Sequence, residues 1–107
     1  MIDAKKLKEE ILEELRSKYP EVVESVKIGY RVQNSKVYLK LRYPFSKSQW
    51  ILTKLDSVVN SLNEKNNNHH VLWLTSSLSR IDGMKDAVFR VYDLLDKDCP
   101  AWVRKYA

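Results

Sequence analysis

The segment Val26–Tyr43 reads VKIGYRVQ, then NS, then KVYLKLRY. Apolar and polar residues alternate on both sides of Asn34-Ser35, which is the period of half-buried strands. Asn tolerates the left-handed backbone conformation that a two-residue hairpin turn requires. We therefore predict an antiparallel hairpin that turns at Asn34-Ser35.

This turn sets a register in which the two faces of the hairpin differ in character. One face pairs only apolar residues: Val32 with Val37, Tyr30 with Leu39, Ile28 with Leu41, and Val26 with Tyr43. The other face pairs Gln33 with Lys36, Arg31 with Tyr38, Gly29 with Lys40, and Lys27 with Arg42. The first face is predicted to join the core, and the second is predicted to form a basic surface.

The charge of the chain is concentrated on that second face. The chain has 19 basic and 14 acidic residues, a net charge of +5, and the hairpin segment contains no acid. The five cations of the hairpin segment are therefore equal in number to the net positive charge of the whole chain. They are Lys27, Arg31, Lys36, Lys40 and Arg42.

Composition predicts one α+β domain spanning residues 1–107, because 44% of the residues are hydrophobic and 31% are charged. No apolar run approaches the ~20 residues of a membrane span. The N-terminal segment lacks the apolar stretch of a signal peptide, and the single Cys99 cannot form an internal disulfide. These features predict a cytoplasmic location.

Two helices flank the hairpin in the sequence. Residues 3–18 carry apolar residues at helical spacing behind Asp3, a plausible N-cap, and Tyr19-Pro20 ends the helix. Ser46 and Gln49 form a capping-box pattern, with Phe45 and Trp50 at the positions of a hydrophobic staple. A second helix is therefore predicted over residues 47–64.

The C-terminal third is predicted to contain one strand and one helix. Val71–Leu74 is a short apolar run typical of a buried strand, and Thr75–Ser79 is predicted to be a loop. A last helix is expected to begin between Ser79 and Asp82 and to end near Lys97. The tail 101–107 is expected to dock on the domain or to form a short helix.

The predicted element order is therefore α-β-β-α-β-α. It favours a two-layer sandwich in which helices pack on one face of a three-stranded sheet. The third strand would lie parallel to the second after a right-handed crossover. This order resembles the type II KH-like arrangement, as in the ribosome-binding factor A family. The resemblance concerns element order alone, because the chain lacks the G-x-x-G loop of nucleic-acid-binding KH domains.

The basic face predicts a nucleic-acid-binding protein, because cations neutralise phosphates and aromatic rings stack on bases. Like charges opposite each other, as at Lys27 and Arg42, weaken a strand pair and suggest selection for something other than stability. The alternative is a solvated edge whose lysines prevent aggregation. DNA and RNA, single and double strand, remain open. The expected contacts are Lys27, Arg31, Lys36, Tyr38, Lys40 and Arg42.

A protein-interaction module is the second hypothesis. It would use the basic face against an acidic partner, or an exposed aromatic patch on the last helix and the tail. The patch would also suit a homodimer, which would bring two basic faces together. Its expected members are Phe89, Tyr92, Trp102 and Tyr106.

No pattern in the sequence predicts catalysis, a metal site or a cofactor. His69 and His70 end a polar segment, 66–70, that is predicted to be a turn or short insert. Adjacent residues of a strand would point to opposite faces, and no acid or thiol lies nearby in the sequence to complete a metal site. Asp98 disfavours a reactive Cys99 thiolate. The hairpin has no carboxylates for metal-dependent nuclease chemistry. Thr75–Ser79 lacks the glycines of a phosphate-binding loop. Because none of these patterns predicts catalysis, we expect a non-enzymatic protein.

Overall fold

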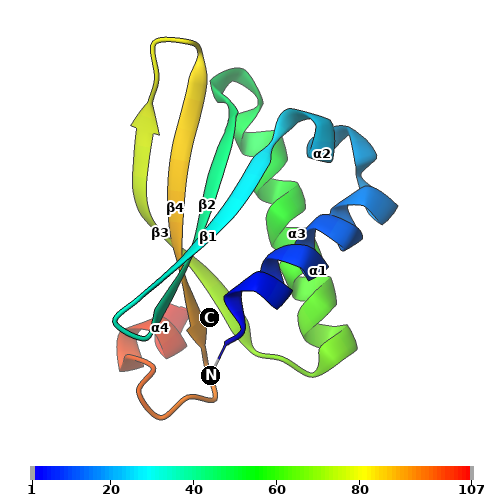
Figure 1. Cartoon of the computed structure of the whole chain (residues 1–107). Helices are drawn as coiled ribbons and strands as arrows, with labels where there is room; N and C mark the ends of the chain where they lie inside the picture. Colours follow the sequence, from blue (N-terminus) through cyan, green and yellow to red (C-terminus); the bar gives the residue numbers. More distant parts are fainter. Residues whose placement is uncertain (1, 107) are drawn as a thin grey trace.

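The computed structural model describes residues 2–106 and has an α+β architecture built on a four-stranded antiparallel sheet (Figure 1). The helices are α1 (Ala4–Lys18), α2 (Pro20–Ser25), α3 (Ser48–Asn66) and α4 (Ala101–Tyr106), and a 3-10 turn, η1, spans Phe45–Lys47. The strands are β1 (Lys27–Gln33), β2 (Lys36–Pro44), β3 (His70–Ser79) and β4 (Met84–Asp93).

The strands are arranged in the order β1-β2-β4-β3, and every neighbouring pair is antiparallel. Helices α1 and α3 lie against one face of this sheet, which we call the inner face (Figure 1). The opposite side is called the outer face. Strands β1 and β3 form the two edges, so β2 and β4 have a neighbour on each side.

The β1–β2 hairpin has the register predicted from its alternation. Lys27 lies opposite Arg42 and Gln33 lies opposite Lys36, and the pairs between them have the same register. Asn34 and Ser35 have φ angles of 52° and 64°, as a two-residue turn of the I′ type requires. The local sequence therefore determines both the turn and the face to which each side chain points.

The core lies between the inner face and the two long helices. Leu39 on β2, Val91 on β4, Ile11 on α1 and Val58 on α3 are all fully or almost fully buried. A polar contact links the two long helices at their surface, since the Glu14 carboxylate on α1 lies 3.6 Å from the Lys65 ammonium on α3.

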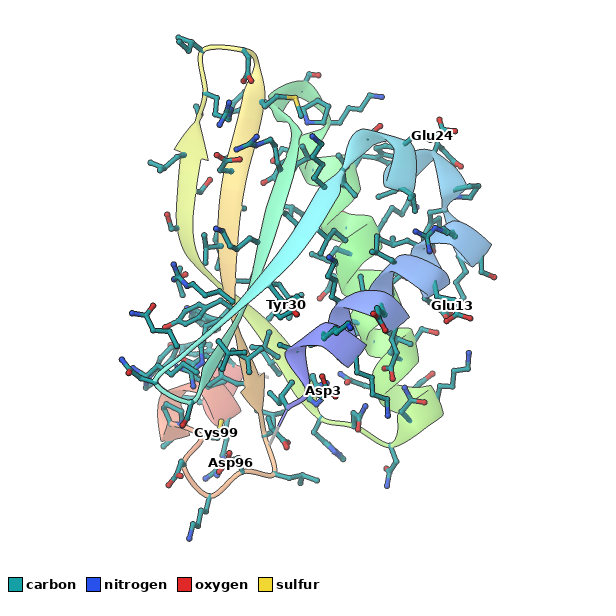
Figure 2. The ribbon with its side chains drawn as sticks, viewed as in Figure 1. Asp3, Glu13, Glu24, Tyr30, Asp96 and Cys99 are labelled. Atoms are coloured by element: carbon teal, nitrogen blue, oxygen red, sulfur yellow. The ribbon has the colours of Figure 1, made fainter. Side chains whose placement is uncertain are left out.

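The hydrophobic inner face is not covered along its whole length. Tyr30 and Val32, expected in the core, point to the inner side of β1 but are 41% and 53% exposed. Figure 2 labels Tyr30 on the sheet beside the first turns of α1. The hairpin extends beyond the helical layer, so alternation predicted the face of these residues but not their burial.

The predicted last helix is wrong. Residues 84–93 form β4, and the expected loop 75–79 is part of β3, which pairs with β4 rather than running parallel to β2. The sheet therefore has four strands, and the likeness in element order to a type II KH-like domain does not hold. The α+β class is confirmed, whereas the three-stranded sheet is corrected.

A short turn explains this difference. The amide of Arg80 donates to the Met84 carbonyl at 2.8 Å, which closes a three-residue loop ending at Gly83. Gly83 has a φ of 80°, and the Asp82 carboxylate accepts the Met84 amide at 3.0 Å. Asp-Gly is a strong hairpin signal, and it outweighed the apolar spacing that suggested a helix.

One of the two predicted helix caps differs from expectation. The structure places η1 before α3, and no side chain caps the first turn of α3, so the predicted capping box at Ser46 is wrong. The predicted Asp3 cap is confirmed, since its carboxylate accepts the Lys6 amide at 3.1 Å. The tail forms α4, whose Trp102 packs on outer-face residues, so not all helices lie on one side of the sheet.

Candidate functional site

The six residues of the predicted nucleic-acid face lie together on the outer face of β1 and β2. Their side chains alternate with the buried inner-face residues of β2. Lys27, Arg31, Lys36 and Lys40 are exposed, whereas Tyr38 and Arg42 are partly buried. The long helices α1 and α3 are on the other side, so they do not cover these cations.

The position of each cation in the sheet separates edge protection from other roles. Only Lys27 and Arg31 belong to β1, which is an edge strand. Lys36, Lys40 and Arg42 belong to β2, which pairs with β1 on one side and β4 on the other. Lysines that guard an edge against aggregation act on the edge itself, so this explanation does not cover the cations of β2.

A cation–aromatic row crosses the middle of the outer face. The Arg31 guanidinium lies 5.0 Å from the centre of the Tyr38 ring, and the Arg90 guanidinium lies 5.8 Å from the same ring. They approach Tyr38 from the strands on either side of β2. Trp73 on β3 pairs with Arg90 and continues the row to the far edge. At ~4.8 Å between strands, four strands span roughly 15 Å.

One end of the basic face is neutralised by an acid that the hairpin sequence does not contain. Asp86 on β4 lies opposite Arg42, and its carboxylate accepts a hydrogen bond from Arg42 Nε at 2.8 Å. Arg80 Nη1 lies 3.3 Å from the same carboxylate. The Arg42 guanidinium lowers the pKa of Asp86, and Asp86 in turn raises the pKa of Arg42. Arg42 is therefore partly satisfied within the protein.

An aromatic cluster occupies the outer face near β3. Trp73 and Trp102 meet edge to face with ring centres 4.8 Å apart, and Tyr92 lies 6.0 Å from Trp102. Tyr106 lies 6.3 Å from Trp73. Trp102 is 46% exposed and Tyr106 is 71% exposed. The tail thus brings two exposed aromatic residues to the outer face.

This cluster includes three of the four residues expected in the aromatic patch. Tyr92, Trp102 and Tyr106 are brought together as described, but on β4 and α4 rather than on a long last helix. Phe89 points to the inner face and is only 7% exposed, so its expected place in an exposed patch is wrong. Strand alternation sends Phe89 and Tyr92 to opposite sides of the sheet.

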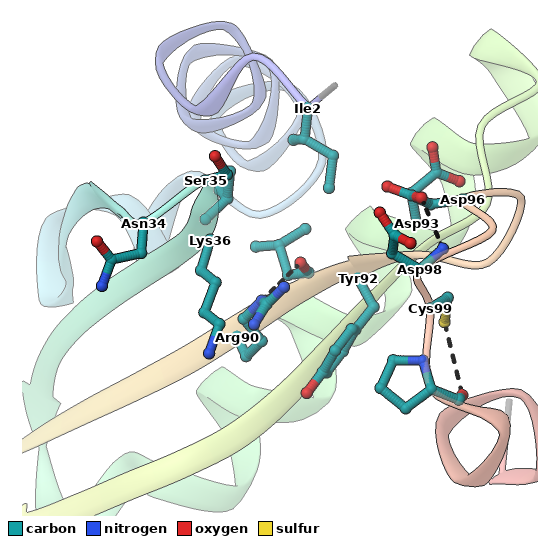
Figure 3. Close-up of a pocket in the computed structure, with 13 residues that line it drawn as sticks. Ile2, Asn34, Ser35, Lys36, Arg90, Tyr92, Asp93, Asp96, Asp98 and Cys99 are labelled. Carbon is teal, nitrogen blue, oxygen red and sulfur yellow. Dashed lines mark hydrogen bonds between the residues drawn. The ribbon is translucent and has the colours of Figure 1, made fainter.

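A groove of about 560 Å³ lies where the β1–β2 turn approaches the segment before α4 (Figure 3). Lys36 and Arg90 line one part of it, and Asp93, Asp96 and Asp98 line another. Asp93 and Asp96 accept backbone amides of their own turn at 3.0 and 2.9 Å. These carboxylates stabilise the loop and would repel a phosphate at this end of the face.

The remaining candidate chemistry gains no support from the geometry. Within residues 2–106 no group of three potential metal ligands comes together. Cys99 is buried, with its thiol 3.8 Å from the Pro100 carbonyl. The segment 75–79 is strand, so the helix N-terminus that could have followed it does not exist there. No helix in this part of the chain is long and apolar enough to cross a membrane.

Sequence reasoning missed the contribution of β4 to this face. Arg90, Asp86 and Trp73 reach the outer face only because residues 70–93 form a hairpin beside β2. The Asp82-Gly83 pair was the available signal. Comparison with protein-family models, with curated proteins and with solved structures finds no match to this chain.

Proposed function

We propose that this protein is a non-catalytic nucleic-acid-binding protein that uses the outer face of its sheet. The observation that carries the proposal is the placement of three cations on an interior strand, where they cannot serve as edge protection. Arg31 and Arg90 extend the positive surface on both sides of β2. A polyanion is the ligand that such a surface attracts most strongly.

The two exposed lysines of β2 would carry most of the binding. Lys36 and Lys40 are exposed, and within residues 2–106 they form no ion pair, so they can reach phosphates. Arg42 already holds Asp86 at 2.8 Å and would contribute less. Tyr38 lies between two guanidinium groups, so its main role would be to position Arg31 and Arg90.

Charge reversal tests the proposal directly. Fluorescence anisotropy with labelled single- and double-stranded DNA and RNA would compare the wild type with the double variant Lys36→Glu, Lys40→Glu. We expect this variant to lose binding while keeping its circular dichroism spectrum, because both side chains point to solvent. If each lysine contacts one phosphate, the salt dependence of residual binding should fall by roughly 2 units.

The matched control is Lys5→Glu with Lys6→Glu, which makes the same change in net charge on the exposed side of α1. This control should bind nearly normally. Equal losses in both variants would show that net charge alone matters and would refute a defined site. A wild type without measurable affinity for any of the four probes at ~50 mM salt, where electrostatic binding is strong, would refute nucleic-acid binding.

A protein partner is the second candidate, and the exposed aromatic rings of α4 favour it. Trp and Tyr are enriched where interfaces gain most of their affinity. Binding through Trp102 and Tyr106 would depend little on salt. A salt titration therefore separates an interface through these two rings from phosphate binding, since phosphate binding weakens log-linearly with salt and an apolar contact does not.

A further inference from the structure

The two edges of the sheet differ in how they are protected against pairing with another strand. β1 carries Lys27 and Arg31 and contains Gly29. β3 has no Lys, Arg, Asp or Glu in its ten residues, His70–Ser79. Natural proteins commonly guard exposed edges with charges, prolines or covering elements. The β3 edge is therefore the one suited to accept a further strand.

The direction of the backbone groups shows which part of this edge is available. The Asn63 side chain bonds both the amide and the carbonyl of His70, at 3.1 and 2.8 Å, on the side facing away from β4. Backbone groups of alternate residues point to the same side of a strand. Leu72 and Leu74 therefore direct their amides and carbonyls outward. A bulge follows between Leu74 and Ser76.

Apolar surface flanks these outward groups on both faces of the sheet. On the inner side, Leu74 is 46% exposed. A groove of about 440 Å³ runs beside the start of β3; Val59, Leu72, Trp73 and Tyr106 belong to its apolar lining, and Asp56 with several Asn and His side chains forms a polar part. An added strand would thus gain main-chain hydrogen bonds along the edge and apolar contacts beside it.

We propose that the occupant of this edge is a second copy of the same chain, paired antiparallel through β3. Only one symmetric register uses both outward residues, and it sets Leu72 opposite Leu74 of the second copy, with the two Trp73 residues facing each other. The His70 contact with Asn63 limits the paired segment at one end and the bulge limits it at the other.

Charge explains why a second copy fits here and not at the other edge. A two-fold interface brings each residue against the same surface of its partner. The paired β3 strands would themselves bring only uncharged side chains together, whereas self-pairing of β1 would bring Lys27 and Arg31 of both copies close to one another. The resulting eight-stranded sheet does not depend on nucleic-acid binding.

Sedimentation of the full chain tests this inference through its mass. At about 200 µM we expect a species of about 25 kDa, twice the 12.6 kDa chain, which dissociates on dilution. Leu74→Lys should raise the dimer dissociation constant roughly tenfold or more, because it introduces two charges at the paired edge. Val32→Lys is the matched control, since Val32 is an exposed apolar residue of the other edge strand.

Three results in sedimentation would overturn the inference. They are a monomeric wild type at the highest concentration, a dimer that survives Leu74→Lys, and an equal loss in Val32→Lys. A monomer would leave the edge to an extended segment of another protein. Hydrogen exchange on the wild type keeps the test valid if Leu74→Lys fails to fold. The outward amides of Leu72 and Leu74 must become more protected as concentration rises, and unchanged exchange would refute pairing.

Discussion

Replacing Ser35 with glycine should stabilise the protein, because Ser35 holds a left-handed conformation in the β1–β2 turn. Its φ of 64° costs an L-residue about 1–2 kcal/mol, and glycine avoids this cost. Glycine also increases the entropy of the unfolded chain, which opposes the gain by about 0.4–1 kcal/mol. The expected net gain in the free energy of unfolding is about 0.5 kcal/mol, or roughly 2–4 °C in Tm.

Urea unfolding followed by circular dichroism measures this change, with the m-value as a check that the transition stays two-state. Ser35→Ala is the control, because alanine has a Cβ atom and keeps the left-handed strain. Only the glycine variant should move the midpoint upward. A lower midpoint for Ser35→Gly, or equal gains in both variants, would refute the argument that strain at this position limits the stability of the hairpin.

Two further predictions concern helix capping and pH. Asp3→Ala should lower the free energy of unfolding by about 1 kcal/mol, because it removes the acceptor of the Lys6 amide. Ser46→Ala should change it by no more than about 0.5 kcal/mol, because Ser46 does not cap α3. Urea unfolding measures both changes, and a larger loss for Ser46→Ala than for Asp3→Ala would contradict the observed helix starts. Burial lowers the pKa of His70 below its ordinary 6.5, despite the opposing charge of Asp93, so the unfolded chain binds this proton more readily. The free energy of unfolding should therefore fall as pH drops below about 6.5, and His70→Gln should flatten that slope; an unchanged slope would refute the assignment.

The hairpin was predictable because its information is local. Alternation along Val26–Tyr43 admits only one register once the turn is placed at Asn34-Ser35, since a slip by one residue would expose the whole apolar set. The structure has that register. Coverage of the inner face by α1 and α3 is a tertiary property, and for that reason the exposure of Tyr30 and Val32 could not be derived from the pattern.

The C-terminal segment was harder because its apolar residues satisfy two periods at once. In β4, Ala87, Phe89 and Val91 face the core, while Val88 and Tyr92 are apolar or aromatic on the outer face. Apolar residues on both sides hide the alternation and fit a helical stripe equally well. The turn at Asp82-Gly83 resolves the ambiguity, because a glycine at positive φ favours a hairpin over continued helix.

The same segment determines how charge is distributed over the candidate site. Seen from the hairpin alone, the basic face contains only cations. β4 adds one cation, Arg90, and one acid, Asp86, to the outer face. The net positive charge on the outer face of β1, β2 and β4 is therefore unchanged, but its position along the strands is different. Asp86 neutralises the end at Arg42, while Arg90 reinforces the middle beside Arg31.

This redistribution changes which variants are informative. Reversing Arg42 would break a pair with Asp86 and confuse loss of stability with loss of binding. Lys40 lies between the end of the face where Asp86 neutralises Arg42 and the end where the aspartates of the groove lie. Within residues 2–106 its positive charge has no acidic partner, so reversing that charge tests binding alone. A ligand phosphate backbone should therefore cross the sheet near Lys40, and reversing Lys40 should weaken binding more than reversing Lys36, which lies beside those aspartates.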